Sequence, residues 1–421
     1  MIPPSPAAIA PAPPVNRRAV TSLGLSQIYA WGVVYYPISL TAEPIAADLG
    51  LSREFVFLGF TLVLIVSALV APWVGRAIDR LGGRSVMSIG AAVAAAALAA
   101  LGAAQGPLSY LAASALAGIA SALTLYDAAF AALVQVAGRD GRRAITYVTF
   151  FGGFASTLFW PLTALAMEQL GWRATYFLYA AGALALCLPL NWFGLRPARD
   201  DAAPAPAPAA EHPDDAPPLR GAARRRAFVL LAIAISAHQL VIAGVTVHLV
   251  GAMSAAGLTT REAIVAGMMF GPAQVLSRAG EMLFGARLPA VAAARVSVAL
   301  LPLALALVVS GHVTPLLACV FVAGCGLSNG LMTIARGAVT LAIFGRDGYG
   351  ASIGDLALAN HLSRAVGPLA FAFALTNAGL HGTFLASMAC ALVGVAGMEA
   401  VARIDARRRA APAPGRNSGA R

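Results

Sequence analysis

The chain has 421 residues, of which 59% are hydrophobic and only 11% are charged, with a mean hydropathy of +0.77. Soluble domains do not have this composition, and the apolar residues here come in blocks of about 20, the length that crosses a bilayer core. The net charge of +11 comes from arginine alone, because the chain has no lysine. The composition therefore excludes a soluble domain and predicts a polytopic membrane protein.

The apolar blocks, in chain order, predict helices in two sets of six. The first set lies near residues 20–42, 55–75, 85–104, 108–136, 145–167 and 174–194. The second set lies near residues 228–253, 263–285, 292–310, 314–336, 351–376 and 380–402. We therefore predict an all-α membrane protein with twelve transmembrane helices in two six-helix halves, residues 20–194 and 228–403.

Three segments rich in Pro, Ala and charge lie outside these halves: an N-terminal tail at 1–19, a linker at 195–227 and a C-terminal tail at 404–421. Such segments cannot bury enough apolar surface to fold, so we expect a disordered N-terminal tail and an unfolded linker. Most of the arginines fall in these segments and in alternate loops. This asymmetry places both termini in the cytoplasm and the chain in the cell inner membrane, and it explains the charge without a nucleic-acid partner.

Short matches between the halves indicate a duplicated unit. The sequence "GRDG" occurs at residues 138–141 and again at 345–348, after the predicted fourth and tenth helices. Nearly the same offset relates "GWRAT", which begins at residue 171, to "GLHGT", which begins at residue 379. Matches in order at one offset favour duplication of a six-helix unit.

The loop after the second predicted helix reads "GRAIDRLGGR", residues 75–84, and resembles the signature of the major facilitator superfamily. The matching residues are Gly75, Asp79, Arg80, Gly82 and Arg84, whereas Gly83 stands where a basic residue is usual. The resemblance implies the twelve-helix fold of that superfamily, with this motif as a cytoplasmic latch between the halves. The alternative is a positively charged loop with an incidental aspartate.

The stretch "GPAQVLSRAGEMLFG", residues 271–285, carries two charges inside an apolar block. Gln274, Arg278 and Glu281 lie on one helical face, which should point away from lipid because a charge there is costly. Two interpretations stay open for Arg278. It binds an anionic substrate, or Glu281, three residues later, neutralises it.

The resemblance implies that polar residues of several other helices converge on a central cavity. The expected substrate-binding residues are Arg278, Arg364, Asn360, Gln274, Gln27, Trp31, Tyr35 and Tyr126. The expected coupling or gating residues are Asp127, Glu281, Arg336 and His238. Arg336 has a second interpretation as one half of an ion pair with Asp127.

Within the superfamily, the chain looks most like the oxalate:formate antiporter and monocarboxylate porter group, because Arg278 and Arg364 match cationic positions of that group. Gln274 stands where the monocarboxylate porters have an aspartate, so proton coupling stays open. We expect a secondary transporter of a small organic anion, a mono- or dicarboxylate, working by alternating access. The alternative is efflux of a toxic compound, such as a drug or an arsenical.

No nucleotide-binding loop and no H-E-x-x-H motif occur in the sequence, so we expect neither enzymatic activity nor a cofactor or bound metal. The expected partners are the lipid bilayer and a small-molecule substrate, with a proton or a counter-substrate as the open choice for coupling. We expect the chain to act as a monomer.

Overall fold

The computed structural model describes residues 16–196, 216–285, 288–309 and 313–410. Regular structure in this part of the chain is helical throughout. Most of both predicted tails, and the linker from residue 197 to 215, lie outside the described residues.

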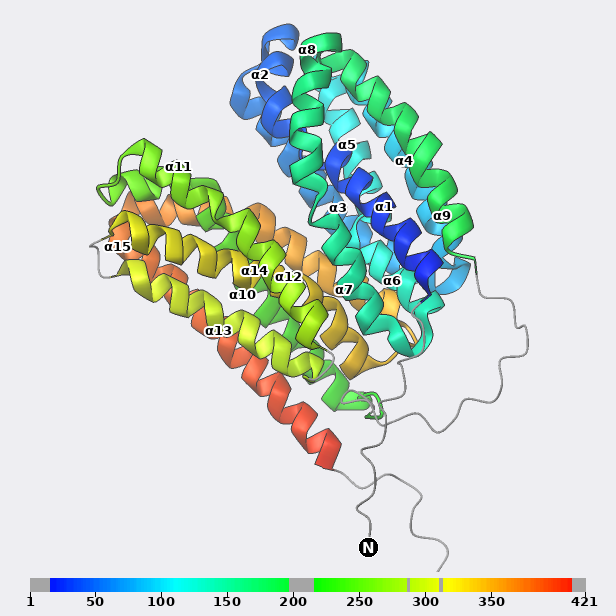
Figure 1. The fold of residues 1–421 in the computed structure, drawn as a ribbon, viewed down its shortest axis with the longest axis vertical. Helices are drawn as coiled ribbons and strands as arrows, with labels where there is room; N and C mark the ends of the chain where they lie inside the picture. The colour runs from blue at the N-terminus through cyan, green and yellow to red at the C-terminus, as the bar shows by residue number, and fades with distance from the viewer. Residues whose placement is uncertain (1–15, 197–215, 286–287, 310–312, 411–421) are drawn as a thin grey trace, which may run out of the picture.

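The helices form two bundles, one from each half of the chain (Figure 1). The first bundle contains α1 (Arg17–Val34), α2 (Ile38–Leu49), α3 (Arg53–Leu81), α4 (Gly83–Gly102), α5 (Pro107–Thr124), α6 (Tyr126–Ala137), α7 (Gly141–Gly152), α8 (Ala155–Gly182) and α9 (Leu188–Gly194). The second contains α10 (Gly221–Ala255), α11 (Thr260–Met268), α12 (Phe270–Phe284), α13 (Ala290–Val309), α14 (Pro315–Phe344) and α15 (Tyr349–Ala410).

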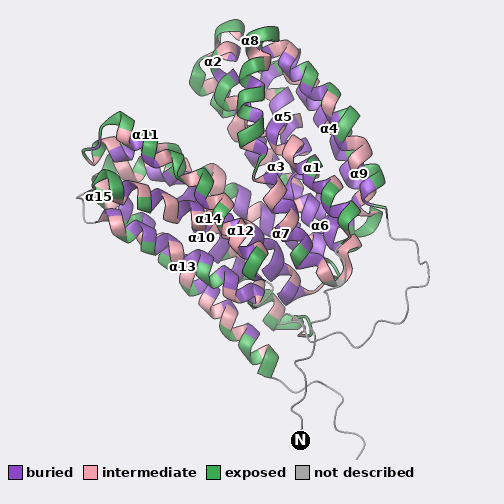
Figure 2. Cartoon of the chain, in the orientation of Figure 1, coloured by how far each residue is buried: buried purple, intermediate pink, exposed green. Residues whose placement is uncertain are grey.

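The two bundles meet at one end of the molecule and diverge at the other, where α2 and α11 lie far apart (Figure 1). We call the joined end, where α1 begins and α15 ends, the terminal side, and the opposite end the far side. Buried residues are concentrated where α6, α7, α12 and α14 come together, and exposed residues lie on the outer faces (Figure 2). The molecule is therefore closed on the terminal side.

Eight helical stretches of the described chain are long and apolar enough to cross a membrane. Two of them, Gly141–Gly194 and Tyr349–Ala410, contain a glycine with non-helical backbone angles, Gly171 (φ 73°) and Gly379 (φ 65°), at which two helices join. These glycines begin the "GWRAT" and "GLHGT" matches, so both halves turn in the same way at equivalent positions. The count of twelve spans stays a prediction.

Four helices predicted as continuous are broken in the structure. The helix expected at 145–167 is interrupted after Gly152, and the helix expected at 263–285 is interrupted at Met269. The helix expected at 20–42 ends at Val34, and α2 starts after Pro37, which has no backbone N–H to donate. The helix expected at 108–136 breaks at Leu125, which is extended (φ −83°, ψ −172°). There the Thr124 carbonyl accepts a 2.6 Å bond from Gln27 Nε2, and the Thr124 hydroxyl donates back to Ala120. Such side-chain bonds compete with the helical ladder.

Contacts between the bundles run along α3 and α15, α6 and α15, and between α7 and both α12 and α14. The backbones of α3 and α15 are in close contact where these helices cross. A Cβ atom on Gly75 would overlap the carbonyl oxygen of Gly350, and one on Gly354 would lie 2.5 Å from the Ala71 carbonyl oxygen. Glycine at these positions lets the two halves close on the terminal side.

Replacing Gly75 with alanine should therefore separate the halves on the terminal side, because the added methyl group has no space beside Gly350. Spin labels at the exposed positions Leu81 and Arg225, one in each half, should report longer distances. Gly251→Ala is the matched control, since no atom lies within 4 Å of the added methyl group. Unchanged distances in Gly75→Ala would contradict this close-contact interpretation.

Candidate functional site

The signature loop joins the halves through Asp79. Its carboxylate accepts backbone hydrogen bonds from Gly350 (2.9 Å) and Ala351 (2.7 Å), the first turn of α15. Those N–H groups have no partner within the helix, and the helix dipole favours a negative charge at this end. Nearby, Arg76 pairs with Asp355 at 2.9 Å, but both side chains are exposed.

Gly75 also contacts the second half, at Gly350, whereas the remaining motif residues lie within the first half. Gly82 takes a positive φ of 83° between α3 and α4, and Arg84 stacks over the ring of Trp192 at 3.8 Å. Arg80 is exposed. A Cβ atom on Gly83 would overlap Ala132, so the packing leaves no space for the basic residue that is usual there. Among the matching motif residues that the structure describes, the side chain that bonds to the second half is the carboxylate of Asp79.

Asp79→Asn should weaken closure on the terminal side, because the amide keeps an acceptor but loses the charge at the helix end. We expect a loss of about 1 kcal/mol, or roughly a fivefold shift toward separated halves, measured with spin labels at Leu81 and Arg225. Asp355→Asn removes an exposed ion pair and should shift the distances much less. Equal effects of the two substitutions would argue against the helix-end interaction.

A second link between the halves is centred on Asp127 of α6. Its carboxylate lies 2.9 Å from Arg336 Nη2 of α14 and 3.0 Å from His361 Nε2 of α15. All three side chains are nearly buried, with 8–12% of their surface exposed. The helix break at Leu125 places Asp127 in the first turn of α6, and its ion pair with Arg336 is the second interpretation that the sequence left open for Arg336.

A third link answers the question that the sequence left open for Glu281. Its carboxylate accepts a 2.8 Å bond from Arg142 Nη2 of α7, and both side chains are buried. The pairing of Glu281 with Arg278 inside one helix is therefore wrong in this structure. Residue 142 lies between the helices predicted at 108–136 and 145–167, but α7 begins at Gly141 and carries Arg142 into the interface.

Glu281→Gln should leave Arg142 buried without its carboxylate and lower the free energy of unfolding by about 3–5 kcal/mol. Arg142→Gln combined with Glu281→Gln should recover much of that loss, whereas Arg278→Gln combined with Glu281→Gln should not. Denaturant unfolding in detergent measures both double variants. Glu399→Gln, which breaks an exposed pair with Arg295, is the control and should cost less than about 1 kcal/mol.

Arg278 is buried on α12, and its partners are neutral. It donates to the Thr149 carbonyl of α7 at 3.2 Å and to Gln274 Oε1 at 3.3 Å, and its Nε has no acceptor among the described residues. The Thr149 carbonyl also accepts from Tyr126 and from Gly153. These hydrogen bonds are long, one acceptor is shared with other donors, and both acceptors are uncharged. The Arg278 guanidinium can therefore bind a carboxylate.

Arg364 of α15 has a similar environment. It donates to the Tyr35 hydroxyl at 2.5 Å, and its guanidinium carbon lies 4.5 Å from the centre of the Tyr35 ring. Tyr36, which the sequence analysis did not single out, lies close enough to interact electrostatically with both Arg278 and Arg364. The two arginines therefore approach one region from the second half, facing aromatic residues of the first.

The remaining predicted residues divide into two groups. Trp31, Tyr126 and Gln274 lie beside the arginines, and Asn360 is buried one turn before Arg364. Two others lie inside single bundles. Gln27 is fully buried and bonds to Thr124, and His238 is 2.8 Å from Ser328 Oγ between α10 and α14. These positions favour packing roles for Gln27 and His238.

Sequence reasoning missed His361, Arg142 and Tyr36. His361 lies three residues before Arg364 in α15, so its place beside a predicted site residue was a signal that could have found it. Tyr36 follows Tyr35 at the end of α1, where the unexpected helix break turns both rings toward the interface. Nothing in the local sequence identifies the partner of Arg142, 139 positions away.

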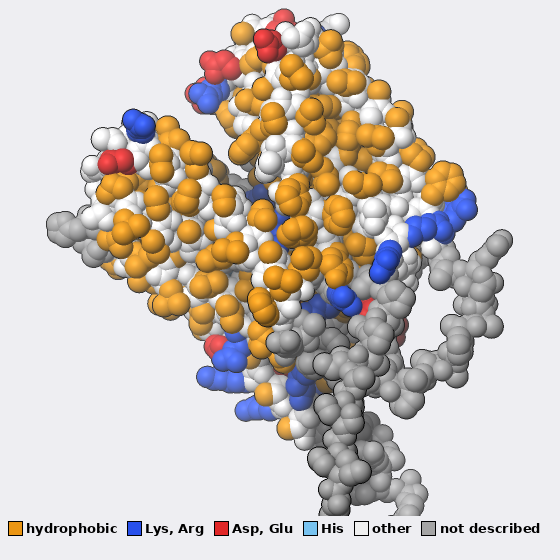
Figure 3. Space-filling view, in the orientation of Figure 1, with side chains coloured by type: hydrophobic (Ala, Val, Ile, Leu, Met, Phe, Trp, Pro, Cys, Tyr) orange, Lys and Arg blue, Asp and Glu red, His pale blue; other side chains and the backbone are white. Residues whose placement is uncertain are grey.

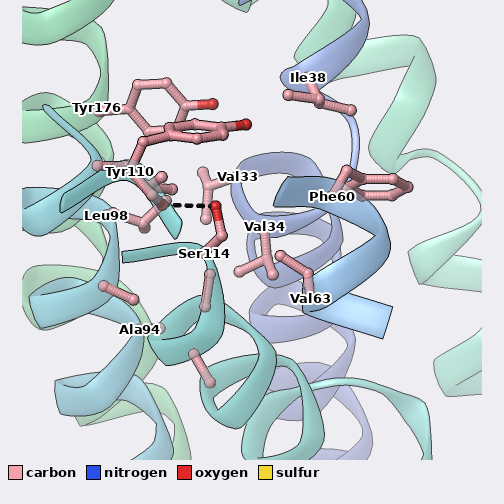
Figure 4. Close-up of a pocket in the computed structure, with 14 residues that line it drawn as sticks. Val33, Val34, Ile38, Phe60, Val63, Ala94, Leu98, Tyr110, Ser114 and Tyr176 are labelled. Atoms are coloured by element: carbon pink, nitrogen blue, oxygen red, sulfur yellow. Dashed lines mark hydrogen bonds between the residues drawn. The ribbon is translucent and has the colours of Figure 1, made fainter. Parts of the chain in front are cut away.

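Two spaces in the molecule differ in what they could hold. A cleft between the bundles opens toward the far side, and basic side chains are visible deep within it (Figure 3). A separate pocket inside the first bundle, beside Tyr110, Ser114 and Tyr176, has a volume of about 30 Å³ (Figure 4). That is space for one or two water molecules, so this pocket is too small for a carboxylate substrate.

Comparisons with known proteins agree with this architecture. The family model described as Major Facilitator Superfamily matches residues 23–291, more than half of the chain. The crystal structure of the human organic anion transporter MFSD10 (TETRAN) superposes with a TM-score of 0.70 at 17% identity, covering 91% of this chain and 100% of that one. At that identity the likeness shows the fold alone. No curated protein matches the chain.

Proposed function

Because the chain belongs to the major facilitator superfamily, we propose that it carries a small organic anion across the membrane by alternating access. Members of this family are transporters and not enzymes. The choice of an anion rests on one observation. Among the described residues of the interface, Arg142 and Arg336 have carboxylate partners, whereas Arg278 and Arg364 are held by neutral oxygen atoms.

The charge balance of the interface supports an anionic substrate. Arg142 pairs with Glu281 and Arg336 pairs with Asp127, whereas Arg278 and Arg364 have no carboxylate at ion-pair distance among the described residues. Uncompensated charge at membrane depth is costly, and a carboxylate can accept two parallel hydrogen bonds from a guanidinium. Two such groups suit either a dicarboxylate or a monocarboxylate shared between them.

The proposal also includes the orientation of the chain in the membrane. The arginine-rich terminal side is the cytoplasmic side by the positive-inside rule, so the conformation described here is open to the outside. Binding between Arg278 and Arg364 would precede separation of Asp79 from α15 and opening to the cytoplasm. Asp127 with His361 is the place where a coupling proton could act. The described contacts do not favour efflux of a drug or an arsenical.

Substituting lysine for Arg278 or for Arg364 should reduce uptake on the order of tenfold or more, because a point charge cannot reproduce the planar pair of hydrogen bonds. Flux of labelled mono- and dicarboxylates into proteoliposomes is the measurement. Arg295→Lys, at an exposed ion pair, is the matched control and should transport normally. If alanine at both sites leaves flux at the wild-type rate, the arginines are structural and the anion proposal fails.

A further inference from the structure

Four aromatic side chains of the first half form a continuous surface that we call the aromatic wall: Trp31, Tyr35, Tyr36 and Tyr126. Trp31 is its centre. The Trp31 ring centroid lies 5.3 Å from that of Tyr35, 6.5 Å from that of Tyr36 and 5.0 Å from that of Tyr126. The ring planes are inclined by 65°, 42° and 48°, respectively, so the rings do not stack tightly on one another.

The aromatic wall borders both unpaired arginines. The Arg364 guanidinium lies over the Tyr35 ring, and the Tyr36 ring packs against Tyr35 with the centroids 5.4 Å apart. Tyr126 shares the Thr149 carbonyl with Arg278. Cations from one half and ring surfaces from the other therefore enclose the same region.

Three of these rings, Trp31, Tyr35 and Tyr36, differ from aromatic residues that serve packing alone. Tyr110 and Tyr349 are almost fully buried, and each hydroxyl donates to a backbone carbonyl. Trp31, Tyr35 and Tyr36 remain partly exposed. The indole N–H of Trp31 is buried without an acceptor among the described residues, which is an unfavourable state that a carboxylate oxygen could relieve.

We infer that the substrate is a carboxylate carried on an aromatic ring, with the carboxylate at Arg278 and Arg364 and the ring against Trp31 and its neighbouring tyrosines. This inference rests on the proposed function and adds the aromatic class to it. A small aliphatic acid offers no flat apolar face, so the aromatic wall would contribute little to its binding. Aromatic pairs interact more strongly than the buried area alone explains.

The test compares benzoate with cyclohexanecarboxylate, which share a carboxylate and a six-membered ring but differ in aromaticity. Affinities are measured by calorimetry on the purified full chain in detergent, with acetate as the ligand without a ring. Benzoate should bind the wild type about two- to tenfold more tightly than cyclohexanecarboxylate. In Trp31→Leu this ratio should fall to about one, because the preference for benzoate is lost. In Trp31→Phe most of the preference should remain. Trp73→Leu, on an exposed face of α3, should leave it unchanged.

The outcomes separate the two proposals. If the wild type binds benzoate no more tightly than cyclohexanecarboxylate, the aromatic inference is overturned. This measurement does not depend on the folding of any variant. A ratio unchanged in Trp31→Leu overturns it as well. If acetate and cyclohexanecarboxylate bind as well as benzoate, and alanine at Arg278 or Arg364 abolishes binding, the anion function stands without the aromatic class. If none of these monocarboxylates binds, the aromatic inference fails, and the flux of labelled dicarboxylates decides whether the anion function stands.

Discussion

Charges buried between the two halves of this transporter must find a partner, because an isolated ion in an apolar medium is highly unfavourable. The described carboxylates of this region meet that constraint across the interface: Asp127 with Arg336 and His361, and Glu281 with Arg142. Each of these links joins one half to the other. Closure on the terminal side and neutralisation of buried charge are therefore the same event, and separation requires water to reach these groups.

The same constraint supports the proposed distinction between gating residues and substrate-binding residues. A guanidinium that already has a carboxylate gains little from a substrate anion, whereas the hydrogen bonds of Arg278 and Arg364 within the described part of the chain go to uncharged oxygen atoms. Both arginines belong to the second half, and the aromatic wall belongs to the first. A substrate that contacts both sets binds differently when the halves rearrange. That difference is what allows a ligand to shift a conformational equilibrium.

The sequence predicted the features that depend on composition and local spacing. Apolar blocks and arginine placement indicated the membrane fold, and the spacing of Gln274, Arg278 and Glu281 predicted one polar face on α12. The sequence did not predict the ion pair that Glu281 forms across the interface. An i, i+3 neighbour such as Arg278 is visible from spacing, but Arg142, the actual partner of Glu281, is related to it only by the packing of α7 on α12.

The prediction of continuous helices at 20–42 and 108–136 was wrong for a similar reason. Pro37 explains the end of α1, but no proline or glycine marks the break at Leu125. At that break, the Thr124 carbonyl accepts a hydrogen bond from Gln27, which lies 97 residues earlier. The break that positions Tyr126 and Asp127 thus coincides with a contact between helices that hydropathy does not encode.

The bond between Asp79 and the first turn of α15 has a consequence for the speed of the cycle. Aspartate has a short side chain with few rotamers, and its acceptor sites face amide groups that the helix already holds in place. Re-forming this contact therefore costs little conformational entropy compared with docking a long arginine side chain. A contact that is modest in strength yet quick to re-form allows repeated opening without a slow search at each turnover.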